Sequence, residues 1–188
     1  LSQHKNTVSK IADQQLEAII DWANQFNIPE LSNIDTMFYK TTGIPRNKKD
    51  LMALRFIHVP NAGITEIPPE LSILQNVHGI CLSGNLIKVI PYQICEMISV
   101  TMLDLDDNLI MEIPEDIGNM IRLCQIDLDE NNIKTIPNSL LKLENLTTLR
   151  LKKQKHGYSL NEIDAPLSEA SQRFLARLFD KEDFRLTL

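Results

Sequence analysis

The chain has 188 residues, a formal net charge of −6, and 43% hydrophobic but only 5% aromatic residues. This length suits one domain, and the apolar content is too high for a disordered segment. The apolar stretches are only a few residues long, which excludes a transmembrane helix, and the acidic balance argues against a nucleic-acid partner. The sequence begins at Leu1 rather than Met, as it would if an N-terminal segment had been removed. A targeting signal in such a segment is therefore not observable.

Residues 7–26 have the spacing of an amphipathic helix. One side is charged, with Lys10, Asp13, Glu17 and Asp21, and the other is apolar, with Val8, Ile11, Ala12, Leu16, Ile19, Ile20, Ala23 and Phe26. We expect Asn27 and Pro29 to end this helix. We interpret it as an N-terminal cap into which Trp22 packs, since a lone Trp is more often buried than ligand-binding.

Residues 28–50 read as a degenerate copy of the repeat that follows them. Leu31, Ile34, Ile44 and Pro45 precede Leu54, Ile57, Ile67 and Pro68 by 23 residues each. Residues 35–42 could be helical instead. We therefore assign residues 1–50 to a helical N-terminal cap with a degenerate first repeat.

A 23-residue period decides the architecture. Ile-Pro recurs at 44–45, 67–68, 90–91, 113–114 and 136–137, and each unit reads LxxLxxLxLxxNxLxxIPxxL. This unit resembles a leucine-rich repeat over roughly residues 44–155. One unit cannot cover its own apolar side, so the units must stack. We predict an α/β repeat fold: a leucine-rich-repeat solenoid over residues 51–155, with a short parallel concave sheet.

One polar column runs through the otherwise apolar repeat. It contains Asn85, Asn108 and Asn131, with Ala62 and Gln154 at its ends. Because buried backbone polar groups must be satisfied, we expect these amides to bond backbone groups left unpaired where each strand turns away. Column residues of this kind are structural rather than catalytic.

Residues 156–188 are predicted to form the C-terminal cap. Asp164 is a good N-cap, Pro166 follows in the first turn, and residues 164–180 then show an amphipathic helical face. An alternative is that this helix is exposed and binds a partner. We favour the cap, because an uncovered last repeat would expose a large apolar patch.

Side chains between the buried leucines should form ladders on the concave face, one rung per repeat. The ladders are Phe56, Gly79, Met102, Gln125, Thr148; His58, Cys81, Asp104, Asp127, Arg150; Pro60, Ser83, Asp106, Asp129, Lys152; and Asn61, Gly84, Asp107, Glu130, Lys153. From them we predict a protein-binding surface made of Phe56, His58, Met102, Asp104, Asp106, Asp107, Gln125, Asp127, Asp129, Glu130, Arg150, Lys152 and Lys153.

Two interpretations of the six carboxylates in this set have equal weight. The carboxylates form a docking patch for a basic protein surface, or they form a solvated ladder that the basic residues of the next repeat neutralise. The six are Asp104, Asp106, Asp107, Asp127, Asp129 and Glu130. A calcium site is disfavoured, because the spacing is not that of an EF-hand loop and a flat sheet does not wrap an ion.

The sequence predicts no enzyme, no metal and no cofactor. It lacks phosphate-binding, dinucleotide-binding, zinc-protease and serine-hydrolase motifs. His58 and Cys81 share a ladder, but Asp104 beside Cys81 should raise the thiol pKa and weaken a thiolate. Cys81, Cys95 and Cys124 lack CxxC spacing, which argues against a disulfide framework or a zinc site and fits a reducing compartment.

Three segments extend the resemblance: Trp22-Ala23-Asn24, Ile28-Pro29-Glu30 and Gly43-Ile44-Pro45-Arg46-Asn47-Lys48. With the 23-residue IPxx[LI] form, they are similar to bacterial leucine-rich-repeat proteins, especially the effectors that enteric pathogens deliver by type III secretion. The resemblance implies a non-enzymatic module, secreted into a host cell, that binds a host protein.

Some members of that effector family add a C-terminal ubiquitin-ligase domain with a catalytic Cys. Only about 33 residues follow the repeats here and none is Cys, so we expect no ligase domain in this chain. The alternative function is a substrate-recognition arm of a larger enzyme. We expect a monomer that binds neither nucleic acid nor membrane.

Overall fold

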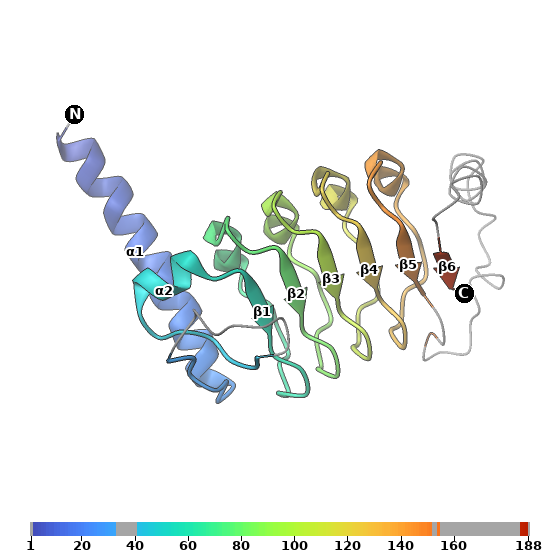
Figure 1. Cartoon of the computed structure of the whole chain (residues 1–188), viewed down its shortest axis with the longest axis horizontal. Coiled ribbons are helices and arrows are strands. Elements are labelled where there is room, and N and C mark those ends of the chain that lie inside the picture. The colour runs from blue at the N-terminus through green and yellow to red at the C-terminus, as the bar shows by residue number, and fades with distance from the viewer. Residues whose placement is uncertain (1, 33–40, 152–153, 155–184, 188) are drawn as a thin grey trace.

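A six-stranded parallel sheet runs along the row of repeats, with α1 beyond β1 at one end (Figure 1). The structure is a computed structural model that describes residues 2–32, 41–151, 154 and 185–187, with the backbone alone for 2–8 and 185–187. The strands pair in chain order: β1 (Phe56–His58), β2 (Gly79–Cys81), β3 (Met102–Asp104), β4 (Gln125–Asp127), β5 (Thr148–Arg150) and β6 (Arg185–Thr187).

The first five strands are in 23-residue register. Ile57 pairs with Ile80, Ile80 with Leu103, Leu103 with Ile126, and Ile126 with Leu149. All five of these central side chains are buried, while most of their strand neighbours are partly exposed. The predicted stacking of equivalent leucine positions on adjoining parallel strands is confirmed.

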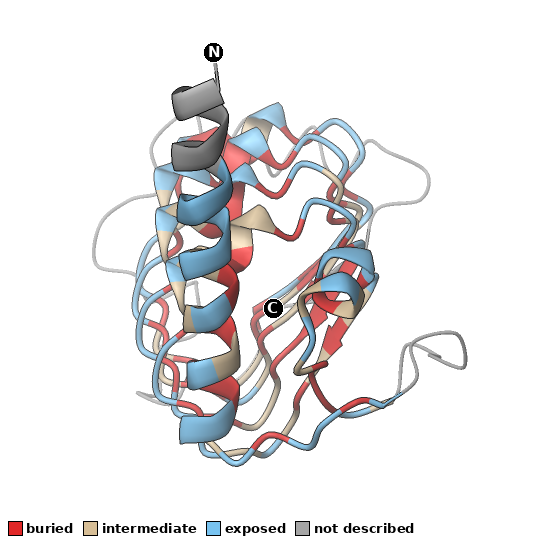
Figure 2. Cartoon of the chain, turned by 90° about the vertical axis from the view of Figure 1, so that its left-hand side faces the viewer, coloured by how far each residue is buried: buried red, intermediate tan, exposed pale blue. Residues whose placement is uncertain are grey.

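Each repeat returns on the side opposite the sheet through a short 3-10 helix. These helices are η1 (Pro69–Ile73), η2 (Tyr92–Glu96), η3 (Glu115–Asn119) and η4 (Asn138–Lys142). In the last four of the five Ile-Pro pairs the proline directly precedes one of these helices, and its carbonyl accepts the first helical hydrogen bond, as from Ile94 N to Pro91 O at 3.0 Å. The fixed φ of proline suits this entry position. Buried residues recur along each turn of the coil, next to exposed ones (Figure 2).

The asparagine column bonds the backbone as expected. Asn108 Oδ1 accepts from Ile87 N at 3.0 Å, and its Nδ2 donates to Leu82 O, Leu105 O and Asp106 O at 3.0–3.1 Å. Asn85 and Asn131 repeat this pattern one unit before and after. Gln154 ends the column in the same way, with Oε1 accepting from Ile133 N at 2.8 Å. Each amide therefore ties its own repeat to the preceding one.

The N-terminal helix is longer than predicted and only partly packed. Helix α1 (Ser2–Gln25) begins before the expected residue 7, lies at one end of the row of repeats (Figure 1) and packs against η1. Trp22 is buried as predicted, and its Nε1 donates to Glu66 O at 2.9 Å. Ile11 and Ala12 were expected on the buried face, but both are exposed, because the first half of α1 extends beyond the stack (Figure 1).

The segment after α1 ties the cap to the first repeat. Asn27 adopts a left-handed φ of 50°, and Ile44 is fully buried as the degenerate repeat predicts. The guanidinium of Arg46 donates to Asn24 Oδ1, Ile44 O and Ile28 O at 2.5–2.8 Å. Helix α2 (Lys48–Ala53) follows, and Lys48 pairs with two carboxylates of α1. The possible helix at 35–42 falls largely on residues 33–40, which lie outside the described residues.

At the other end, β6 pairs parallel with β5 and adds a strand that the sequence did not predict. The predicted capping helix at 164–180 lies outside the described residues, and so do Lys152 and Lys153. The proposed boundaries at residues 50 and 155 stay predictions. Among the described helices, none is both long enough and apolar enough to cross a lipid bilayer.

Candidate protein-binding surface

Two of the four predicted ladders lie in the strands themselves. Strand register places Phe56, Gly79, Met102, Gln125 and Thr148 side by side, and next to them His58, Cys81, Asp104, Asp127 and Arg150. The buried central residue of each strand leaves these flanking positions on the opposite face of the sheet, since successive side chains point to opposite faces. The concave face therefore carries both ladders as predicted.

The other two ladders lie just past the strands. Asn61, Gly84, Asp107 and Glu130 all adopt left-handed φ values of 49–67°. The ladder that contains Asp107 and Glu130 is therefore a row of turn residues, not of strand residues, which corrects the expectation that it belongs to the sheet. The turn still keeps successive repeats side by side, because Gly84 N bonds Asp106 O and Asp107 N bonds Asp129 O.

Two carboxylates of the surface are fixed by these turns. Asp104 Oδ1 accepts from Asp106 N, and Asp127 Oδ1 accepts from Asp129 N, each at 3.2 Å. A carboxylate can accept several hydrogen bonds, so the second oxygen of each group stays available to other donors. Asp104 and Asp127 are adjacent in the register of β3 and β4, and both are half-buried. The backbone thus holds two acids side by side at a set orientation.

The second oxygens have different donors. The Cys81 thiol donates to Asp104 Oδ2 at 3.2 Å and lies 3.5 Å from Ser83 Oγ. Burial raises the pKa of Cys81, and the charge of Asp104 raises it further, so the predicted direction is confirmed, with burial as the larger cause. The thiol hydrogen bonds go to Asp104 and Ser83 rather than to His58, which offers no support for a Cys/His nucleophile.

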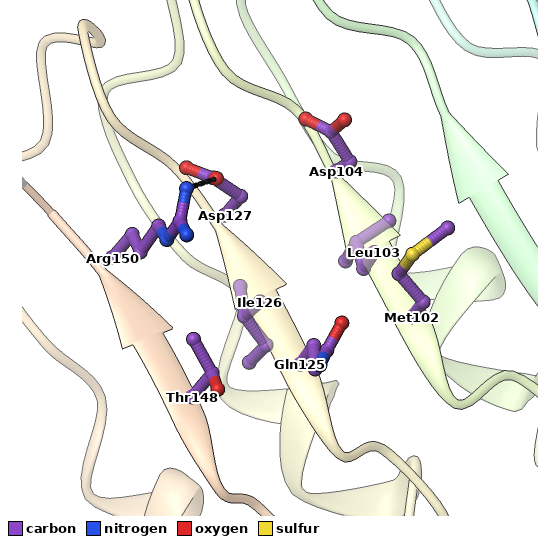
Figure 3. Close-up of a pocket in the computed structure, with 8 residues that line it drawn as sticks. All are labelled: Met102, Leu103, Asp104, Gln125, Ile126, Asp127, Thr148 and Arg150. Carbon is purple, nitrogen blue, oxygen red and sulfur yellow. Dashed lines mark hydrogen bonds and ion pairs between the residues drawn. The ribbon is translucent and has the colours of Figure 1, made fainter. Parts of the chain in front are cut away.

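Asp127 Oδ2 accepts from Arg150 Nη1 at 3.1 Å (Figure 3). Burial raises the pKa of Asp127, and the positive charge of Arg150 partly opposes that shift. Burial also raises the pKa of Asp106, to about 6, with further contributions from Asp127, Asp104, Asp129 and Glu130. The acids therefore repel one another in the folded chain, and this repulsion favours a positively charged group nearby.

A hollow of about 270 Å³ opens among these side chains, over β3, β4 and β5. Figure 3 shows Met102, Gln125 and Thr148 along one row and Asp104, Asp127 and Arg150 along the next. Leu103 and Ile126 also line the hollow, although their side chains are buried on the other face of the sheet. The prediction omitted Thr148 from the binding set, although its ladder position already placed it here.

Gly79 has a packing role that the sequence analysis did not assign. A Cβ at this position would lie 2.8 Å from Phe56 Cδ1 and 3.3 Å from Met102 Cε. The Phe56 ring and the Met102 methyl group therefore close over the glycine and form an apolar platform beside the hollow. The signal in the sequence was that Gly79 is the only glycine in a ladder otherwise made of larger side chains.

The rest of the predicted set divides into two groups. Asp106, Asp129 and Glu130 are half-buried and are not among the residues that line the hollow, while Asp107 is exposed. Within the described ranges, no group of three or more His, Cys, Asp or Glu residues is arranged to hold a metal ion. All three cysteines are free.

A family model described as leucine rich repeat matches residues 98–154. The chain folds as a leucine-rich-repeat solenoid. Domains of this kind are generally protein-interaction scaffolds, and no catalytic family is indicated. No curated protein matches the chain significantly.

Solved leucine-rich-repeat structures resemble parts of the solenoid. A leucine-rich-repeat protein of Leptospira interrogans aligns over 72% of this chain and 30% of its own, with 24% identity and a TM-score of 0.53. An internalin of Listeria monocytogenes aligns over 76% and 35%, with 20% identity and a TM-score of 0.52. Both likenesses show the fold alone.

A third structure is the plant peptide hormone receptor RGFR1 in complex with RGF2. It aligns over 53% of this chain and 16% of its own, with 32% identity and a TM-score of 0.50. The solenoid thus corresponds to 35% or less of each of these three proteins.

Proposed function

We propose that the solenoid is a non-enzymatic module that binds a protein with a basic surface on its concave face. The observation that carries the proposal is the placement of Asp104 and Asp127 on adjacent strands, each held by a backbone N–H and facing a hollow. Curved repeat stacks use extended concave surfaces for binding. A positive partner surface complements this one in charge and would associate faster because of it.

The raised pKa values of Asp106 and Asp127 support the same proposal. Burial is the larger cause of both shifts, and the neighbouring carboxylates add to it, so the fold carries a like-charge cost in the absence of a partner. Lysine or arginine side chains from a partner would offset the repulsion. The proposed contacts are the predicted set, with Lys152 and Lys153 included although they lie outside the described residues.

A charge-reversal variant tests the proposal. Asp106→Lys, Asp129→Lys and Glu130→Lys are combined, and Asp104 and Asp127 are kept because their carboxylates bond the turn backbone. The matched control reverses three exposed acids outside the concave strands: Glu112→Lys, Glu115→Lys and Asp116→Lys. The partner is captured on the native protein and then tested against both variants.

We expect the concave variant to lose capture while the control retains it. Circular dichroism and thermal unfolding check that both variants stay folded. Retained capture by a folded concave variant would reject the acidic surface as the binding site. Loss of capture by the control variant alone would indicate that the partner binds outside the concave strands.

For the place of action we propose a host cell, with the chain delivered as a secreted effector and working in a reducing cytosol. The lead-in residues around Trp22 and Arg46 support this through their resemblance to type III effectors, and the free cysteines suit a reducing compartment. A translocation reporter fused to the full chain tests delivery. Signal that does not depend on an intact secretion apparatus would contradict it. A longer reading frame that encodes an enzyme would favour the substrate-recognition alternative.

A further inference from the structure

The hollow has the size and chemistry for a single cationic side chain. Small-molecule sites typically occupy about 300–1,000 Å³, and this hollow, at about 270 Å³, is smaller. Its polar lining offers carboxylate oxygens from Asp104 and Asp127, the amide of Gln125 and the hydroxyl of Thr148. Planar guanidinium, with its fixed fork of five donors, matches such a set of acceptors better than an ammonium group does.

The chain itself supplies a guanidinium at this place. Arg150 enters from β5 and bonds Asp127, and its own side chain stays 52% exposed. Asp104 lies one strand further along, and its bonded donors are a thiol and a backbone N–H, both uncharged. Within the part of the chain that the structure describes, Asp127 is therefore paired with a cation, whereas the hydrogen bonds to Asp104 come from uncharged donors.

The platform lies at a set distance from the hollow. Neighbouring strands are about 4.8 Å apart, so the midpoint between β3 and β4 is roughly 7 Å across the sheet from Gly79 on β2. In an extended peptide, side chains two residues apart point to the same side and are separated by about 6.6–7 Å. A peptide crossing the strands can thus place one side chain on the platform and the next-but-one at the hollow.

The peptide side chain that enters the hollow must be long. The platform residues lie in the first ladder, whereas Asp104 and Asp127 lie in the second ladder, two residues further along each strand. Two residues of strand span about 6.6–6.8 Å. A peptide lying over the first ladder therefore reaches the carboxylates only with a side chain as long as arginine or lysine.

We propose that the concave face binds an extended partner segment in which an apolar side chain packs on Phe56 and Met102, and an arginine two residues away occupies the hollow between Asp104 and Asp127. This inference rests on the proposed function and deepens it, because it states which side chains of the partner the concave face recognises and how far apart they are in the partner's sequence.

Short capped peptides of identical composition test the spacing directly. Two place Leu and Arg two residues apart, as Leu-Ser-Arg and as Arg-Ser-Leu within a Gly/Ser chain, and a third places Leu and Arg adjacent. Each is titrated into the ¹⁵N-labelled full chain and followed by NMR. We expect at least one of the spaced peptides to bind about tenfold more tightly than the adjacent one, through one further charge-assisted contact. The shifts should centre on Met102, Gln125 and Thr148.

Two variants locate the binding. Thr148→Arg places a cation in the hollow without removing either acid, and it should abolish binding of the spaced peptide. Thr147→Arg adds the same charge at an exposed neighbouring position and should leave binding unchanged. Asp104→Asn with Asp127→Asn should also abolish binding, and the Thr148 variant keeps the test valid if that double variant fails to fold.

Equal affinity for spaced and adjacent peptides would overturn the inference, as would equal effects of the two arginine variants. If partner capture requires Asp106, Asp129 and Glu130 while the spaced and adjacent peptides bind equally well, the proposed function stands and only this inference is rejected. Capture that is insensitive to all of these acids would reject both.

Discussion

Arg150 and Asp127 form an ion pair across β5 and β4, with Nη1 and Oδ2 3.1 Å apart. The two residues are equivalent positions of successive repeats, 23 residues apart in the chain. The last of the five repeat strands therefore places a positive charge where the two preceding strands place a negative one. This arrangement lets the repeat accumulate acids over β3 and β4 while it limits their repulsion at β5.

The first prediction concerns that ion pair. Replacement of Arg150 by Gln should raise the pKa of Asp127 further, because the positive charge that opposes the burial effect is removed. Carboxyl carbon NMR during a pH titration measures this shift. The pair is partly exposed and should contribute only about 0–1 kcal/mol to the free energy of unfolding. Arg122→Gln, which removes an exposed charge elsewhere, is the control, and a lowered Asp127 pKa in the Arg150 variant would contradict the assignment.

The second prediction concerns pH. The pKa of Asp106 is about 6 in the folded chain and 3.8 in the reference state, so the folded protein binds the proton more tightly. A raised carboxyl pKa means that stability is greatest below the reference pKa and is lost as pH rises through about 6. We therefore expect the solenoid to become more stable as pH falls from about 7.5 to about 5.

Asp106→Asn isolates this effect. It should stabilise the protein at neutral pH by about 1 kcal/mol, well below the full value of the shift because the side chain is partly exposed to solvent. It should also flatten the rise in stability between neutral and mildly acidic pH. Urea unfolding at several pH values gives both quantities. A steeper profile in the Asn variant would have the wrong sign and would refute the assignment.

The third prediction concerns the asparagine column. Asn108→Ala removes four hydrogen bonds to backbone groups of two adjacent repeats, three of them to buried groups. We expect a loss of about 3 kcal/mol or more in the free energy of unfolding, since buried groups left unsatisfied are costly. Asn119→Ala, at an exposed position on η3, should change stability by about 0.5 kcal/mol or less. Equal losses in the two variants would show that the column does not join the repeats as described.

The period alone was sufficient to predict the strands, their register and their buried centres. It succeeded because one 23-residue unit has only one way to cover its apolar side, so that Leu105 and Leu128 must occupy equivalent buried places. The asparagine column was predictable for a related reason. A buried amide that recurs at one position has few partners besides the backbone of the neighbouring repeat.

Three features could not be read from the period. The first half of α1 continues past the stack because helix formation needs only local hydrogen bonds, whereas burial of Ile11 needs a neighbour that the stack does not supply there. The left-handed turn at Asp107 and Glu130 depends on backbone dihedral angles that a polar ladder does not reveal. The strand β6 follows a segment without the repeat, so no column pointed to it.

The fourth prediction tests the apolar platform through Gly79. An added Cβ would lie 2.8 Å from Phe56 Cδ1, closer than two carbon atoms can pack, so Gly79→Ala should displace the Phe56 ring. We expect a loss of about 1 kcal/mol in the free energy of unfolding, as for other modest overpacking in a folded chain. Chemical denaturation followed by circular dichroism measures it.

The double variant Phe56→Ala with Gly79→Ala supplies the control, because removing the ring removes the clash. If Phe56 and Gly79 are coupled as the packing indicates, the double variant should be more stable than the sum of the single losses predicts, by about 0.5 kcal/mol or more. Additive losses would mean that the ring does not rest on the glycine, and the platform beside the hollow would then lack its defining contact. The same cycle, measured with the spaced peptide bound, separates the role of the platform in binding from its role in folding.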